Sequence, residues 1–76
     1  MENAVELAYT GLSASTVRRA LEPVSEGIYE KDLALSGQSR VIARFRDGVS
    51  RETFEAYMRG VNWSPGRLLW ANWLTL

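Results

Sequence analysis

The sequence has 76 residues, a length that supports one hydrophobic core and therefore one domain, residues 1–76. Hydrophobic residues make up 46% of the chain and charged residues 24%, which is typical of a folded globular protein and argues against a disordered one. Nine basic residues balance nine acidic ones, so binding held mainly by excess positive charge is not expected, although local charged patches remain open.

The sequence contains no histidine and no cysteine. This excludes thiolate nucleophiles, disulfides, the usual zinc sites and imidazole acid–base chemistry. Carboxylates remain, but Asp32 and Asp47 lie in no spacing typical of a calcium loop or a paired-acid site. We therefore expect a protein that is not an enzyme and that uses no cofactor or metal.

No signal-like segment follows Met1, and no window is apolar for the roughly 18 residues that a membrane span requires. We expect a soluble, cytoplasmic protein with no membrane partner. A small domain without disulfides or metals has a modest core, and association with another chain commonly adds stability. The composition therefore favours a protein partner.

The first expected element is a strand from Ala4 to Thr10, where apolar and polar residues alternate. Gly11 permits a turn, and either Ser13 or Ser15 can cap a following helix. Apolar residues recur in that helix at helical spacing: Val17, Ala20, Leu21 and Val24.

Pro23 is unfavourable inside a helix, because it lacks an N–H group and clashes with the preceding turn. The helix is therefore expected to be short or to be kinked near Leu21, with residues 25–27 finishing the segment.

A β-hairpin is expected next, with a strand from Tyr29 to Ser36, a tight connection over residues 36–39 and a second strand from Arg40 to Arg46. One face of the first strand carries Lys31, Leu33 and Leu35. In the second strand, Val41, Ala43 and Phe45 should face the helices, and the other face carries Arg40, Ile42, Arg44 and Arg46.

Ser50 is expected to cap a second helix, with Glu52 in its first turn, and residues 63–66 should end the segment. Its apolar stripe is formed by Phe54, Tyr57, Met58 and Val61. Residues 68–76 fit either a strand or a short helix, and a strand is favoured because aromatics are dense there. The resulting βαββα(β) order predicts an α+β, ferredoxin-like fold with an antiparallel sheet and two helices on one face.

Two groups of surface residues suggest binding. Trp63, Trp70 and Trp73 either complete the core or anchor a contact with another subunit. A row of arginines, Arg40, Arg44 and Arg46, is either a solvated sheet face that also prevents edge association, or an RNA-binding face on which Trp70 or Trp73 stacks with bases. Charged residues flanking the two helical stripes are expected to be solvated. A ligand-sensing domain is a third option, but no glycine-rich or charged pocket motif supports it.

Two stretches resemble a known family. In residues 14–23 the matching positions are Ala14, Val17, Ala20, Leu21 and Pro23, and residues 51–59 (RETFEAYMR) are similar to a family helix with arginine at both ends and a tyrosine between them. Asp47, just before that helix, also fits. The family is the small dimerisation subunit of the KEOPS (EKC) complex, which supports formation of threonylcarbamoyladenosine in transfer RNA. The resemblance covers about residues 4–62 and consists of helix-packing patterns. The chain departs from it at Glu55 and in the tryptophan-rich segment 68–76, as a divergent paralogue would.

The resemblance implies a non-catalytic subunit that forms a homodimer, or a heterodimer with a paralogue, through its sheet. It also implies that the helices dock on a larger catalytic subunit and that transfer RNA is met through the assembly. The helix residues that match, Val17, Leu21, Phe54, Tyr57 and Met58, would then be divided between the core and subunit contacts. Together with the three tryptophans they form the expected partner-binding set.

Overall fold

A computed structural model of the chain describes residues 1–33 and 37–76. The elements follow the order βαββαβ, with a short 3₁₀ turn after the first helix. Their bounds are β1 Ala4–Thr10, α1 Ala14–Leu21, η1 Glu22–Val24, β2 Ser25–Leu33, β3 Gln38–Phe45, α2 Arg51–Arg59 and β4 Arg67–Leu74. The expected residues Leu35 and Ser36 of the hairpin lie outside the described residues.

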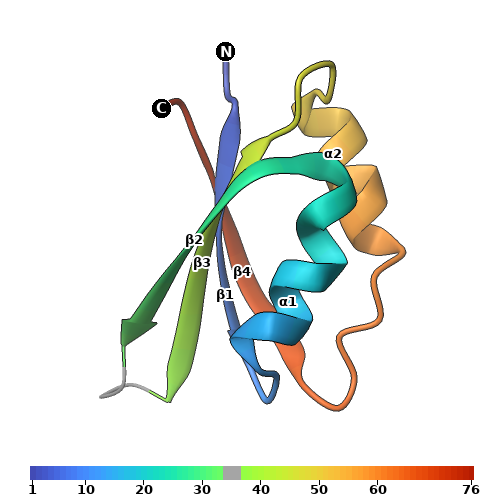
Figure 1. Cartoon of the computed structure of the whole chain (residues 1–76). Helices are drawn as coiled ribbons and strands as arrows, with labels where there is room; N and C mark the ends of the chain where they lie inside the picture. The colour runs from blue at the N-terminus through green and yellow to red at the C-terminus, as the bar shows by residue number, and fades with distance from the viewer. Residues whose placement is uncertain (34–36) are drawn as a thin grey trace.

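The four strands form one antiparallel sheet in the order β2-β3-β1-β4. Both α-helices pack on the same face of this sheet, and the two chain ends lie near each other at one end of it (Figure 1). The architecture is α+β with ferredoxin-like topology, as the sequence pattern predicted. The segment that could have been a helix or a strand is the edge strand β4.

Serine side chains begin both helices. Ser13 Oγ accepts a hydrogen bond from the Thr16 N–H, and Ser50 Oγ accepts one from the Thr53 N–H, each at 3.2 Å. Such caps satisfy N–H groups that have no partner inside the helix. Of the two serines proposed as the first cap, Ser13 is the one that performs this role.

The first helix is short, as Pro23 predicted. It ends at Leu21, and Pro23 lies in the first turn of η1, where its missing N–H is not needed. The prediction that residues 25–27 finish the helical segment is wrong, because β2 already begins at Ser25, which pairs with Phe45 of β3.

The core lies between the sheet and the helix layer. Phe45 and Phe54 stack at its centre with ring centroids 4.8 Å apart. The side chains that β1 and β3 send toward the helices are buried, as the alternation predicted: Val5, Leu7, Tyr9, Val41, Ala43 and Phe45. This arrangement leaves the other face of the sheet as a separate surface.

Two glycines hold the end of β1 against the start of β4. Gly11 has a φ of +78°, which residues with a side chain rarely adopt. A side chain on Gly66 would bring its Cβ against the Thr10 carbonyl oxygen, and one on Gly11 would lie 2.7 Å from the Cα of Gly66. The close approach of these two backbone segments therefore requires glycine at both positions.

Candidate interaction surface

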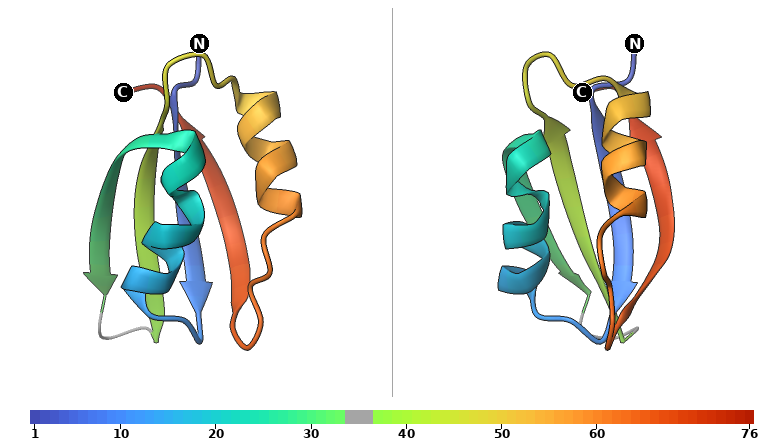
Figure 2. Two further views of the ribbon diagram at one scale, coloured as in Figure 1. Left: turned by 45° about the vertical axis from the view of Figure 1, so that its right-hand side comes forward. Right: turned by 90° about the vertical axis from the view of Figure 1, so that its right-hand side faces the viewer.

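The sheet face opposite the helices is here called the open face (Figure 2). It carries the residues that alternate with the core positions. Directly paired residues of an antiparallel sheet share a face, so the pairing registers define this surface. Its three central rows, running from β2 through β3 and β1 to β4, are Gly27-Arg44-Ala4-Leu74, Tyr29-Ile42-Glu6-Asn72 and Lys31-Arg40-Ala8-Trp70.

Trp70 and Arg40 form one aromatic–cationic contact on this face. The guanidinium carbon of Arg40 lies 5.2 Å from the ring centroid of Trp70, within the range of a cation–π interaction. Arg40 also lies 3.9 Å from a carboxylate oxygen of Glu6. Trp70 is 36% exposed, and it is the tryptophan that the structure places on the outside of the sheet.

Tyr29 is a second exposed aromatic residue, and the sequence pattern alone did not single it out. It is 57% exposed, and its ring lies against Gly27, where a Cβ would come within 3.1 Å of the tyrosine hydroxyl. Tyr29 pairs with Ile42, whose open-face orientation was expected from the alternation in the second hairpin strand. If the hairpin register had been known, this pairing with Ile42 would have placed Tyr29 on the open face. Tyr29 and Trp70 lie on opposite edge strands of the sheet, and these strands are three strand spacings, or about 14 Å, apart.

Of the three arginines expected to form a row on this face, the structure places two there. Arg40 and Arg44 lie on the open face, and Arg44 pairs with Glu26 at 3.3 Å. Arg46 leaves the row because β3 ends at Phe45. Its guanidinium donates a hydrogen bond to the carbonyl of Glu22 at 3.1 Å, on the helix side of the molecule. The prediction that Arg46 projects from the same face is therefore corrected.

Trp73 and Trp63 pack against the core. Trp73 makes edge contacts with Phe45 and Phe54 at centroid distances of 6.0 and 6.3 Å, and the Arg51 guanidinium lies 4.7 Å from the Trp73 ring centroid. A hydrogen bond to Glu2 raises the pKa of Arg51 above its already high ordinary value, so Arg51 stays charged. Of the three tryptophans, Trp63 and Trp73 therefore pack against the core, and Trp70 is exposed on the open face.

Four helix residues of the expected partner-binding set belong to the core. Buried side chains cannot reach a partner, which assigns all four to internal packing: Val17, Leu21, Phe54 and Met58. Tyr57 is half-buried, and its hydroxyl donates a hydrogen bond to the Ala20 carbonyl at 2.5 Å, which connects α2 to α1. The helix pattern in the sequence thus reports packing between the helices and the sheet.

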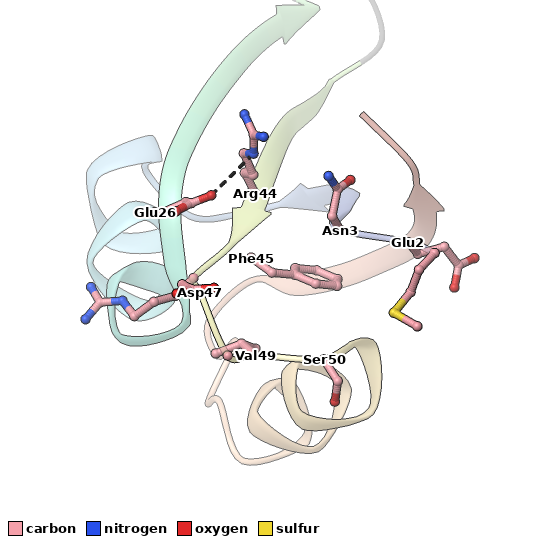
Figure 3. Close-up of a pocket in the computed structure, with 11 residues that line it drawn as sticks. Glu2, Asn3, Glu26, Arg44, Phe45, Asp47, Val49 and Ser50 are labelled. Atoms are coloured by element: carbon pink, nitrogen blue, oxygen red, sulfur yellow. Dashed lines mark ion pairs between the residues drawn. The ribbon is translucent and has the colours of Figure 1, made fainter.

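A shallow pocket of about 510 Å³ lies where the N-terminal segment, the end of β3 and the start of α2 meet. Figure 3 shows Arg44 and Glu26 pointing toward each other at its rim. Glu2, also in the lining, is bound to Arg51 at 2.8 Å. These two ion pairs are formed within the chain, so neither pair presents an unpaired charge to the pocket.

Among residues 1–33 and 37–76, no three carboxylate, histidine or cysteine side chains gather into a group that could hold a metal ion. In the same residues, neither helix has the length and apolar composition needed to cross a membrane. Comparison with protein-family models, with curated proteins and with solved structures found no match to this chain.

Proposed function

We propose that the chain is a non-catalytic interaction subunit that associates with a second copy of itself on the β4 side of its sheet. The observation that carries the proposal is the placement of Trp70, which remains 36% exposed on the open face while Trp63 and Trp73 pack inward. Tryptophan is enriched at the centres of protein interfaces, because it buries a large area at a small entropic cost.

The cations of the open face are paired in a way that suits burial against protein. Arg40 lies beside Glu6, and Arg44 beside Glu26, so two of the cations on this face already have carboxylate partners. A paired charge loses less on desolvation than an isolated one, and arginine beside aromatic residues is typical of interfaces. A net charge of zero also allows two copies to approach each other.

The resemblance to the KEOPS small subunit extends the proposal to a transfer-RNA modification complex, in which the helix layer faces a larger catalytic subunit. A groove of about 540 Å³ supports this arrangement. It is lined by Ala20, Ala56, Tyr57, Gly60, Val61 and Asn62. Several of these residues are small, which lets another backbone approach α1 and α2 closely.

Sedimentation equilibrium of the purified chain tests self-association. We expect a reversible dimer, and we expect Trp70→Ser to raise the dissociation constant by at least about tenfold, as loss of an aromatic anchor does. Arg59→Ser is the matched control, because Arg59 lies on the exposed side of α2 and should leave the constant unchanged. A wild-type chain that stays monomeric at its highest soluble concentration would contradict the proposal.

RNA binding by the open face is a second candidate, favoured by the Arg40–Trp70 contact and by exposed Tyr29 and Lys31. Stacked bases and phosphate contacts would then give salt-dependent affinity. Two features favour protein over RNA: the carboxylates beside both arginines, and the separation of about 14 Å between the edge strands that carry Tyr29 and Trp70, which prevents adjacent bases from stacking on both.

Transfer-RNA titration monitored by tryptophan fluorescence tests this second candidate. RNA binding predicts that Arg40→Ser combined with Arg44→Ser weakens affinity and reduces its salt dependence. Arg46→Ser is the control, since its guanidinium is bound to the Glu22 carbonyl. Equal affinity of all variants would contradict an RNA-binding open face.

A further inference from the structure

The outer edge of β4 is an unusually apolar sheet edge. The sheet order places β4 at the margin, and six of its eight residues are apolar (RLLWANWL). The only charged residue of β4 is Arg67, at the start of the strand, and β4 contains no proline. Edge strands without charges, prolines or covering elements are templates for pairing with another strand.

The opposite edge is protected. β2 carries exposed charges at Glu26, Glu30 and Lys31, and its pairing with β3 is irregular between Ser25 and Gly27. Charged side chains and bulges are the usual means of preventing edge pairing. A second chain is therefore expected to add at β4 and not at β2.

The regular part of β4 runs from Trp70 to Leu74. Its pairing with β1 is shifted between Ala8 and Tyr9, which leaves Leu69 as a bulge residue without a direct partner. The centre of the regular stretch is Asn72, which is exposed and is the only polar residue between Leu68 and Leu74.

We propose that two copies of the chain pair through antiparallel β4 strands, with the two-fold axis at Asn72. This inference rests on the proposed self-association and names its surface and register. Residue numbers of opposite partners then add to a constant, so Asn72 meets its own copy, Trp70 meets Leu74 of the second copy, and Ala71 meets Trp73 of the second copy.

This register is complementary in polarity and in size. The two Asn72 amides each supply a donor and an acceptor to the other. Large side chains lie opposite smaller ones on both faces of the joined sheet, with Trp73 against Ala71 on the helix side. No charged residues oppose one another between Trp70 and Leu74, so no like-charge repulsion arises.

Neighbouring charges also permit the approach. Arg51, whose guanidinium lies over the ring of Trp73 in β4, is bound to Glu2 at 2.8 Å, so this charge pair is neutralised within one chain. The right view in Figure 2 looks onto the helix side of the molecule. In this view α2 covers part of the sheet, and β4 runs along the outer margin of the sheet. With a two-fold axis perpendicular to the sheet, the open faces of the two copies form one continuous surface. One Trp70 then lies on each side of the axis.

Single cysteine variants test the register, because the natural chain has no cysteine. Directly opposite residues in antiparallel strands have Cα atoms about 4.5–5.5 Å apart, within the range that a disulfide spans. Asn72→Cys should therefore form a covalent dimer under mild oxidation. In Ala71→Cys, the matched control, the two cysteines would be two residues out of register and about 8 Å apart, so crosslinking should be at least about tenfold slower.

A second variant tests the same axis without crosslinking. Asn72→Lys places two ammonium groups opposite each other and should raise the dimer dissociation constant by at least about tenfold, whereas Tyr29→Lys on β2 should not. A wild-type dimer that neither crosslinks through Asn72→Cys nor weakens with Asn72→Lys overturns this register and leaves the proposed self-association in place. A monomeric wild type overturns both.

Discussion

Arg40 on β3 and Trp70 on β4 meet above Ala8 of the intervening strand β1, with 5.2 Å between the guanidinium carbon and the ring centroid. Ala8 is completely buried although it lies on the open face, because its small side chain is flanked by these two long ones. The contact therefore links the edge strand β4 to the inner strand β3 across the buried side chain of Ala8.

A double-mutant cycle measures this link. We expect Arg40→Met and Trp70→Leu to show a coupling of about 0.5–1 kcal/mol in the free energy of unfolding, the range of an exposed cation–π pair. Urea denaturation at one fixed protein concentration gives the four values. Additive effects of the two substitutions would show that the geometry carries no net interaction.

The hydrogen bond between helices gives a second prediction. Tyr57→Phe removes the donor to the Ala20 carbonyl and should lower the free energy of unfolding by about 1 kcal/mol. Tyr29→Phe is the matched control, because Tyr29 is exposed on the open face, and its loss of a hydroxyl should be nearly neutral. Equal effects in thermal or urea denaturation would argue against the interhelical bond.

The glycine contact gives a third prediction. Gly66→Ala would force a Cβ onto the Thr10 carbonyl and should cost about 3 kcal/mol, a severe backbone clash. Gly48→Ala is a control at a position with a left-handed backbone but with open space around it, since Gly48 has a φ of +85° and a Cβ added there would meet no atom within 4 Å. It should cost only about 1 kcal/mol. The reverse order of the two unfolding free energies would contradict the close approach.

The aromatic core gives a fourth prediction. Phe54→Ala should cost about 3–5 kcal/mol, because Phe54 is fully buried against Phe45 and Trp73. A core of this size supplies roughly 3–5 kcal/mol in total, so the variant should be largely unfolded by circular dichroism. Arg59→Ala, on the same helix but exposed, should change the unfolding free energy by less than about 0.5 kcal/mol. A cooperatively folded Phe54→Ala would contradict this account of the core.

Features governed by local chemistry were predictable from the sequence. A serine hydroxyl reaches the N–H three residues later whatever the rest of the fold does, so the cap at Ser50 could be identified directly. Alternation along the second hairpin strand likewise predicted that Val41, Ala43 and Phe45 face the helices, because side chains of a strand alternate between two faces.

Features governed by pairing between distant segments were not predictable. β2 begins at Ser25 because that residue pairs with Phe45, twenty positions further on. Strict alternation along β4 would put Leu68 on the same face of the sheet as Trp70, but the bulge at Leu69 turns Leu68 toward the core. A single unpaired residue thus changes which face a leucine occupies.

The candidate surface was predicted in part for the same reason. The tryptophan-rich segment and the arginines were recognised, yet the sequence could not separate exposed Trp70 from Trp73, whose ring is packed by Phe45 and Phe54. Nor could it show that Arg46 turns back to the Glu22 carbonyl, a contact set by where β3 ends. The position of each of these side chains depends on neighbours that are distant in the sequence and come together only in the folded chain.

The unequal edges of the sheet limit how far the chain can assemble. A chain with two apolar edges would add further chains at both ends and grow into a fibre. Here Glu26, Glu30 and Lys31 line one margin, so an assembly that uses the β4 margin is complete once two chains have joined. If the proposed pair forms, we expect that replacing those charges with valine or threonine removes that stop and lets the pair extend into an open polymer.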